Sequence, residues 1–133
     1  MKVYFISGHL NLSKEEFETH YQPLMDKAIQ ESNVAFVVGD ARGCDAMAQD
    51  YLYQCSISTV TIFHLFHTPR NNVHGYAAKG GFRTDEERDA AMTQASDADI
   101  LWIRPLASQK ALLGKKFRAN HSTGTEKNKL RRK

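Results

Sequence analysis

The stretch VAFVVGDARGCDAMA, residues 34–48, joins an apolar run to a helical pattern through a turn that holds two glycines. Its first five residues are all apolar, which is typical of a strand buried on both faces of a parallel sheet. Gly39 and Gly43 allow a tight turn, and a helix is expected from about Asp45 onward. A buried strand followed directly by a helix indicates an α/β fold.

Further strands and helices extend this unit in both directions along the chain. Pro23 lies inside one helical pattern and predicts a kink or a break there. Ser13 and Thr84 each begin a capping box, which marks the start of a helix. Strands are expected at Val3–Ile6, Val34–Val38, Ser58–Phe63 and Ile100–Ile103, and helices over about 13–29, 45–54, 84–95 and from about 122.

The alternation predicts an α/β protein with one domain over residues 1–133. We expect a Rossmann-like, three-layer domain with a mostly parallel sheet of four to five strands. The hydrophobic share of 41% in 133 residues suits one core. Right-handed crossovers place the carboxyl ends of the strands along one edge, where such sheets bind ligands. A long loop without secondary structure is expected at about 64–83, and Trp102 is expected in the core, inside the last strand.

Composition argues against several classes of protein. No run approaches the roughly 18 consecutive apolar residues of a membrane span, and the first residues do not resemble a secretory signal. A cytoplasmic protein without a membrane partner is therefore expected. Cys44 and Cys55 form neither a disulfide framework nor a Cys-x-x-Cys zinc site. His64, His67 and His74 lie close in sequence but lack a scaffold for a closed site, so we expect no metal and no cofactor.

Charge is unevenly distributed along the chain. Residues 115–133 hold eight Lys or Arg residues and one acidic residue, whereas the rest carries 10 basic and 14 acidic residues. A basic C-terminal helix at about 122–133 on an acidic body can attract the phosphate groups of a nucleotide or a nucleic acid. The alternative is a solvated helix end.

Small and polar residues follow the first two strands, where a phosphate or ribose site needs them. Glycines let the backbone approach a ligand, and a helix N-terminus offers free N–H groups to an anion. Arg42 suits a phosphate and Asp45 a ribose hydroxyl, although the two could instead pair with each other or cap the turn. The ligand-binding residues expected here are Ser7, Gly8, His9, Gly39, Asp40, Arg42, Gly43 and Asp45.

A second candidate anion site opens the last helix. Ser122, Gly124 and Thr125 combine hydroxyl groups with a glycine at a helix start. The alternative is an ordinary N-cap. Because the fold brings strand ends to one edge, the two candidate anion sites support each other.

The long loop carries cations and aromatic side chains. Arg70, Lys79 and Arg83 are candidates to close over a phosphate, and Tyr76 or Phe82 to stack on a base. The alternative for both aromatic residues is packing beneath the loop.

Several motifs resemble the SLOG superfamily, which includes the LOG phosphoribohydrolases and the DNA-processing proteins of natural transformation. Residues Gly39–Ala48 are similar to its Gly-x-Ala-Arg-Gly-x-Asp turn. Arg88–Met92, Ser96–Ile100 and Gly124–Thr125 also resemble nucleoside 2-deoxyribosyltransferases. The resemblance implies a Rossmann-like domain that binds nucleotides or nucleotide-derived ligands at the strand carboxyl ends. It also implies a place for Arg88 at the site, and a homodimer or higher oligomer.

The last motif departs from the family pattern. Catalytic relatives carry Gly-Thr-x-x-Glu, and Asn128 stands where that pattern has Glu. An amide is no carboxylate nucleophile or general base, but Asn128 can still bind a ribose hydroxyl or a phosphate. If the protein is an enzyme, the candidate catalytic carboxylates are Asp40, Asp89 and Glu126.

Three functions stay open at this point. The first is a sensor or sequestering protein that binds a nucleotide or nucleotide-derived ligand. The second is an N-glycoside hydrolase acting on a nucleoside monophosphate or an ADP-ribose-like substrate, so the sequence does not decide whether the protein is an enzyme. The third, a nucleic-acid binding module, is disfavoured because no aromatic residues interleave with the basic ones.

Overall fold

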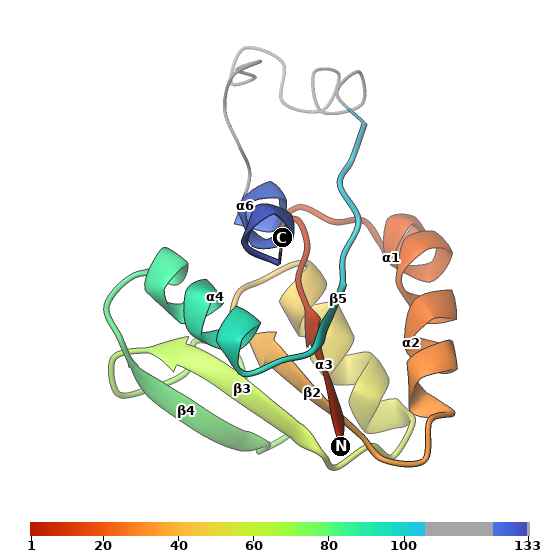
Figure 1. The fold of residues 1–133 in the computed structure, drawn as a ribbon, viewed down its shortest axis with the longest axis horizontal. Helices are drawn as coiled ribbons and strands as arrows, with labels where there is room; N and C mark the ends of the chain where they lie inside the picture. The colour runs from red at the N-terminus through yellow and green to blue at the C-terminus, as the bar shows by residue number, and fades with distance from the viewer. Residues whose placement is uncertain (106–123, 133) are drawn as a thin grey trace.

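The computed structural model describes residues 1–105 and 124–132, and its strands alternate with helices except that the fourth strand follows the third directly (Figure 1). The strands are β1 (Lys2–Ile6), β2 (Val34–Gly39), β3 (Val60–Leu65), β4 (Ala77–Phe82) and β5 (Ala98–Ile100). The helices are α1 (Lys14–His20), α2 (Gln22–Ile29), α3 (Cys44–Gln54), α4 (Asp85–Gln94) and α6 (Gly124–Arg131).

The strands form one sheet in the order β4-β3-β2-β1-β5, and every pair is parallel. From β1 the chain adds β2, β3 and β4 on one side, and β5 then pairs with the opposite edge of β1. The strand order therefore reverses beside β1. Loops that leave strands at such a reversal diverge and open a crevice at the carboxyl ends.

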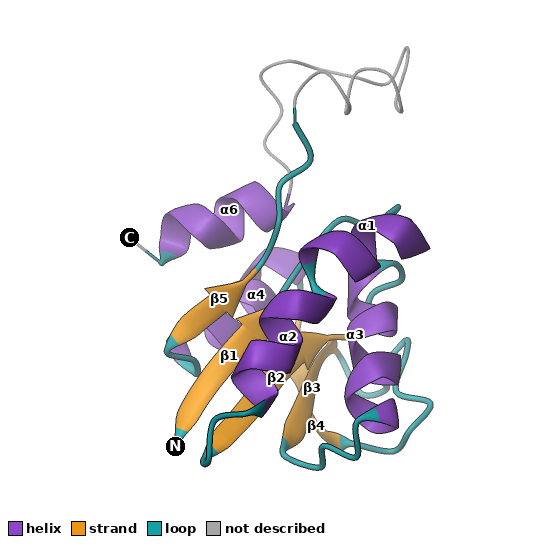
Figure 2. Ribbon diagram, turned by 90° about the vertical axis from the view of Figure 1, so that its right-hand side faces the viewer, coloured by secondary structure: helices purple, strands orange, loops and turns teal. Residues whose placement is uncertain are grey.

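Helices cover both faces of the sheet, which gives three layers (Figure 2). Successive side chains of a strand point to opposite faces, so neighbouring residues enter different cores. Ile6 joins the larger core, with residues of α1, α2 and α3. Phe5 joins the smaller core, with Met92 of α4. None of the helices within the described residues is long and apolar enough to cross a membrane.

The predicted α/β class and parallel sheet are confirmed, and the first helical pattern breaks where Pro23 indicated. Helix α1 ends at His20, and Pro23 lies in the first turn of α2, where its missing N–H costs no helical hydrogen bond. The last helix begins at Gly124, and Ser122 lies outside the described residues.

Two expectations about the strands are wrong. The segment at 64–83 holds β4, an edge strand of sequence AAKGGF that has almost no side chains typical of strands. It forms because its backbone pairs with β3, with a register shift near its end. The last strand covers 98–100 rather than 100–103, so Trp102 lies after β5 and is only partly buried against the larger core.

Candidate functional site

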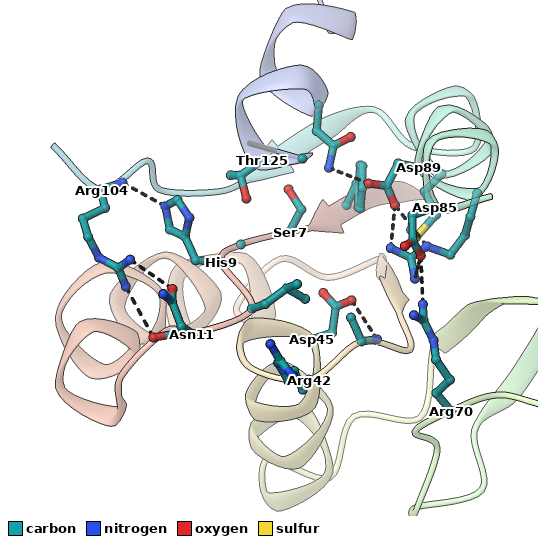
Figure 3. Close-up of a pocket in the computed structure, with 18 residues that line it drawn as sticks. Ser7, His9, Asn11, Arg42, Asp45, Arg70, Asp85, Asp89, Arg104 and Thr125 are labelled. Atoms are coloured by element: carbon teal, nitrogen blue, oxygen red, sulfur yellow. Dashed lines mark hydrogen bonds and ion pairs between the residues drawn. The ribbon is translucent and has the colours of Figure 1, made fainter. Parts of the chain in front are cut away.

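A pocket of about 670 Å³ opens at the carboxyl ends of β1 and β2 (Figure 3). Its walls come from the loop after β1, the turn after β2, α4, the segment after β5 and the start of α6. The residues that line it are Phe5, Ser7, Gly8, His9, Leu10, Asn11, Ala41, Arg42, Asp45, Arg70, Asp85, Arg88, Asp89, Met92, Arg104, Gly124, Thr125 and Asn128.

Close packing holds the loop after β1 against the sheet. A Cβ atom at Gly8 would lie 2.4 Å from the hydroxyl oxygen of Tyr21 and 2.5 Å from Sγ of Cys44, so only glycine fits. The Tyr21 hydroxyl donates to the Ser7 carbonyl at 2.7 Å and accepts from the Trp102 N–H at 3.0 Å. One buried side chain thus ties the loops after β1 and β5 together.

The hydroxyl group of Ser7 is the clearest unsatisfied group in the pocket. Ser7 is 6% exposed, and within the described part of the chain its Oγ has no hydrogen-bond partner. Its side chain points toward the start of α6, where Thr125 lies (Figure 3). Thr125 is 4% exposed, and the first N–H groups of α6 have no partner within the helix. Together these groups offer hydrogen-bond donors to an anion.

On one side of the pocket, His9 and Arg104 join the loops after β1 and β5. His9 Nε2 accepts from the Arg104 N–H at 2.9 Å, so the proton of the neutral ring sits on Nδ1. Burial and the neighbouring Arg104 charge lower the pKa of His9, which keeps it neutral. The Arg104 guanidinium donates to Glu16 at 2.7 and 2.9 Å and to Asn11 at 3.0 Å. These bonds hold Arg104 in the pocket wall.

On the opposite side, Arg88 of α4 organises several carboxyl groups. It donates to Asp40 at 2.8 Å and to Asp89 at 2.9 and 3.0 Å, and lies 3.3 Å from Asp85. Arg70 contacts Asp40 as well, through its N–H at 2.7 Å and its guanidinium at 2.8 Å. Burial alone would raise the pKa of Asp40, but Arg70 and Arg88 outweigh it and the pKa is lowered.

Asp45 and Asp89 are the carboxyl groups most affected by burial. Burial and the neighbouring Asp89 carboxylate raise the pKa of Asp45 to about 7, against the opposing charge of Arg88. Burial also raises the pKa of Asp89, although Arg88 and Asn128 both bond to this carboxyl. The Asn128 amide donates to Asp89 at 3.2 Å. Asn128 therefore supports a neighbouring carboxyl group as well as lining the pocket.

Most of the expected site residues meet at this pocket. Its lining includes Ser7, Gly8, His9, Arg42, Asp45, Arg88, Gly124, Thr125 and Asn128, together with Asp89.

Five expected site residues lie elsewhere within the described residues. Asp40 lies behind the lining and binds two arginines. Gly39 and Gly43 shape the turn: a Cβ at Gly39 would lie 2.5 Å from Asp45, and Gly43 has a φ of 73°. Arg83 and Glu126 do not line the pocket, and Arg83 is exposed.

Of the loop residues, Arg70 alone lines the pocket. Tyr76 donates its hydroxyl to the Ile57 carbonyl, and Phe82 stacks on Phe63, so both aromatic residues pack rather than face a ligand. Lys79 lies over the Phe63 ring. No group of three His, Cys, Asp or Glu side chains suited to a metal ion occurs in the described ranges.

Sequence reasoning missed Asn11 and Arg104. Arg104 follows β5 by four residues in a segment without a motif. Its place in the pocket depends on β5 pairing with β1, which no local pattern shows. No protein-family model, curated protein or solved structure matches the chain.

Proposed function

We propose that this pocket binds a nucleotide or nucleotide-derived ligand through its phosphate group, as a sensor or a sequestering protein. The observation that carries the proposal is the buried Ser7 hydroxyl, which lacks a partner among the described residues and points toward the start of α6. A buried polar group without a partner is costly, and a phosphate oxygen would satisfy it. The N-terminus of α6 favours the same negative charge.

Arg42 supplies a cation at the mouth of the same pocket. Its side chain is exposed, and it makes no hydrogen bond or ion pair within residues 1–105 and 124–132. The guanidinium groups of Arg70 and Arg88, in contrast, already bind carboxylates. Arg42 can therefore bind a phosphate without breaking an existing ion pair.

The test is binding of nucleoside mono- and diphosphates, cyclic nucleotides and ADP-ribose, measured by thermal shift and calorimetry. We expect Arg42→Ala and Thr125→Ala each to weaken binding by more than about 1 kcal/mol, about fivefold in Kd. Ser7→Ala should also weaken ligand binding. Arg83→Ala is the matched control, because Arg83 is exposed and lies outside the pocket. Equal affinities in all four variants and the wild type would contradict the proposed phosphate site.

A second candidate is hydrolysis of the N-glycosidic bond of such a ligand. The observation that favours it is Asp89, a buried carboxyl group in the pocket wall that Arg88 and Asn128 hold in place. Chromatography of the same incubations separates the two functions. Release of free base, lost in Asp89→Asn, supports the hydrolase, whereas a bound but intact ligand supports the binding protein.

A further inference from the structure

Asp45 differs from every other carboxyl group around Arg88. It is the second residue of α3, lines the pocket and is 7% exposed. One oxygen accepts a hydrogen bond from the Ala41 N–H at 3.2 Å. Among the described residues this is the one hydrogen bond of the Asp45 carboxyl, which is directed into the pocket in Figure 3.

The neighbouring carboxyl groups receive the donors that Asp45 lacks. Asp40 binds Arg70 and Arg88, and Asp89 binds Arg88 and Asn128. The hydrogen bonds of Arg88 are thus directed to other carboxylates, and Arg88 acts on Asp45 through charge attraction without a hydrogen bond.

Charged and titratable groups surround Asp45 from several elements. Helix α4 supplies Arg88 and Asp89, and Asp40 directly follows β2. The Cys44 thiol of α3 and the Tyr21 hydroxyl also interact with Asp45, and burial raises the pKa of both so that they stay neutral. Arg42, which is exposed, lies three residues earlier in the same turn. The residues of α6 in the pocket wall, by contrast, are uncharged.

Arg88 is bonded to Asp40 and Asp89, so among the described residues an ionised Asp45 would be a buried charge with one backbone N–H as its hydrogen-bond donor and no bonded cation. Burying such a charge is unfavourable in free energy, and protonation of the carboxyl removes the charge.

We propose that Asp45 determines which ligands this pocket accepts: its carboxyl holds a proton when only the protein surrounds it, and exchanges that proton for a hydroxyl or N–H donor of the ligand. This inference rests on the proposed function, because the phosphate contacts proposed for Ser7, Arg42 and the start of α6 set the orientation of the ligand. Binding then releases the proton to solvent. The ligand keeps its own hydrogen and donates it to the Asp45 carboxylate.

The exchange fits ligands that carry a phosphate and present hydrogen-bond donors, such as sugar hydroxyl groups or an amine, to Asp45. A ligand that presented only acceptors to Asp45 would bind the protonated carboxyl and release no proton. The direction of proton exchange therefore reports which groups face Asp45.

The first test needs no ligand. The chemical shift of the side-chain carboxyl carbon of Asp45, followed by NMR from pH 4 to pH 9, should change with a midpoint near neutrality. Burial, together with the nearby Asp89 and Asp40 carboxylates, raises the pKa of Asp45 to about 7. The signal is assigned by its absence in Asp45→Asn. A midpoint below about pH 5 would overturn the inference, whether or not any nucleotide binds.

The second test is calorimetric titration with ADP-ribose at pH 7, in two buffers of different ionisation enthalpy. ADP-ribose suits this test because its diphosphate lacks the second ionisation near pH 6 of a phosphate monoester. We expect the wild type to release about half a proton per ligand, as a group half protonated at this pH would. Asp45→Asn should release none and bind at least fivefold more weakly.

The control is Asp50→Asn, on the same helix but half exposed and paired with His74 outside the pocket; it should match the wild type. Binding without proton release, or equal release in Asp45→Asn, would overturn the inference and leave the proposed phosphate site intact. Absence of binding by ADP-ribose and by every other nucleotide of the panel would overturn both.

Discussion

At the scale of single residues, Tyr21 connects segments that lie far apart in the sequence. Its hydroxyl donates to the Ser7 carbonyl and accepts from the Trp102 N–H, and its side chain is fully buried. The ring stacks on Phe17 in the larger core. Tyr21 therefore joins the core to two walls of the pocket.

We expect Tyr21→Phe to lower the free energy of unfolding by about 1–3 kcal/mol, because it removes the hydrogen-bond partner of the buried Ser7 carbonyl and of the partly buried Trp102 N–H. Urea denaturation measures the change. Tyr53→Phe is the control, since Tyr53 is 56% exposed and its loss of a hydroxyl should change stability little. Equal effects of the two substitutions would contradict this role of the buried hydroxyl.

At the scale of elements, the start of α1 is joined to the segment after β5. Ser13 and Glu16 form the capping box expected from the sequence. The Glu16 carboxylate also accepts from the Arg104 guanidinium at 2.7 Å. One carboxylate therefore supports both a helix end and the pocket wall.

Because Glu16 contacts both Ser13 and Arg104, its ionisation predicts that the free energy of unfolding depends on pH. Hydrogen bonds from Arg104 lower the pKa of Glu16 to about 2, below the value near 4.3 of an unfolded chain. A carboxyl group whose pKa is lowered by folding stabilises the folded state. Its contribution is complete at pH values above the unfolded pKa and is lost as the pH falls from about 4.5 toward 2. We expect Glu16→Gln to be less stable than the wild type at pH 7, with the difference vanishing by about pH 2. A pH-independent difference in urea denaturation would refute the prediction.

Helix α6 provides the second prediction at this scale. Arg132, directly after α6, donates to the Ser96 carbonyl at 2.9 Å, to the Thr93 carbonyl at 3.3 Å and to Asp99 at 2.7 Å. We expect Arg132→Ala to loosen α6 and raise hydrogen exchange in 124–131, with α4 little changed. The control is Lys127→Ala, because the pair of Lys127 with Glu86 is exposed and such pairs contribute little. Protection of α6 unchanged in Arg132→Ala would contradict this docking role.

At the scale of the whole molecule, one sheet separates two cores. Met92 is 1% exposed in the smaller core and Met25 is fully buried in the larger one. Both cores share the strands β1, β2 and β3, since neighbouring residues of each strand point into different cores. Loss of packing on either face should therefore unfold the whole domain.

We expect Met92→Ala and Met25→Ala each to lower the free energy of unfolding by about 2–5 kcal/mol. The fluorescence of Trp102, which packs against the larger core, should follow the same transition as far-ultraviolet circular dichroism in both variants. Transitions that separate in Met92→Ala would mean that the two faces of the sheet unfold independently.

Local sequence patterns are enough to predict the class of fold and the residues at most strand ends. Apolar runs and capping boxes are local signals, so they located β1, β2, β3, α1 and α4 closely. The parallel arrangement then brought Ser7, Asp45 and Thr125, separated by long stretches of chain, into one pocket. Each lies at the end of an element that local patterning marks.

Three features depend on contacts between distant segments: the edge strand β4, the position of Arg104 and the pKa values of the buried carboxyl groups. β4 has little strand propensity of its own and forms because β3 offers its edge. Arg104 enters the pocket because β5 pairs with β1. Asp40 and Asp45 look alike in sequence, but two arginines bind Asp40 while Asp45 receives one backbone N–H. Burial and the distribution of donors depend on the distant segments that surround each group, and local sequence does not encode them.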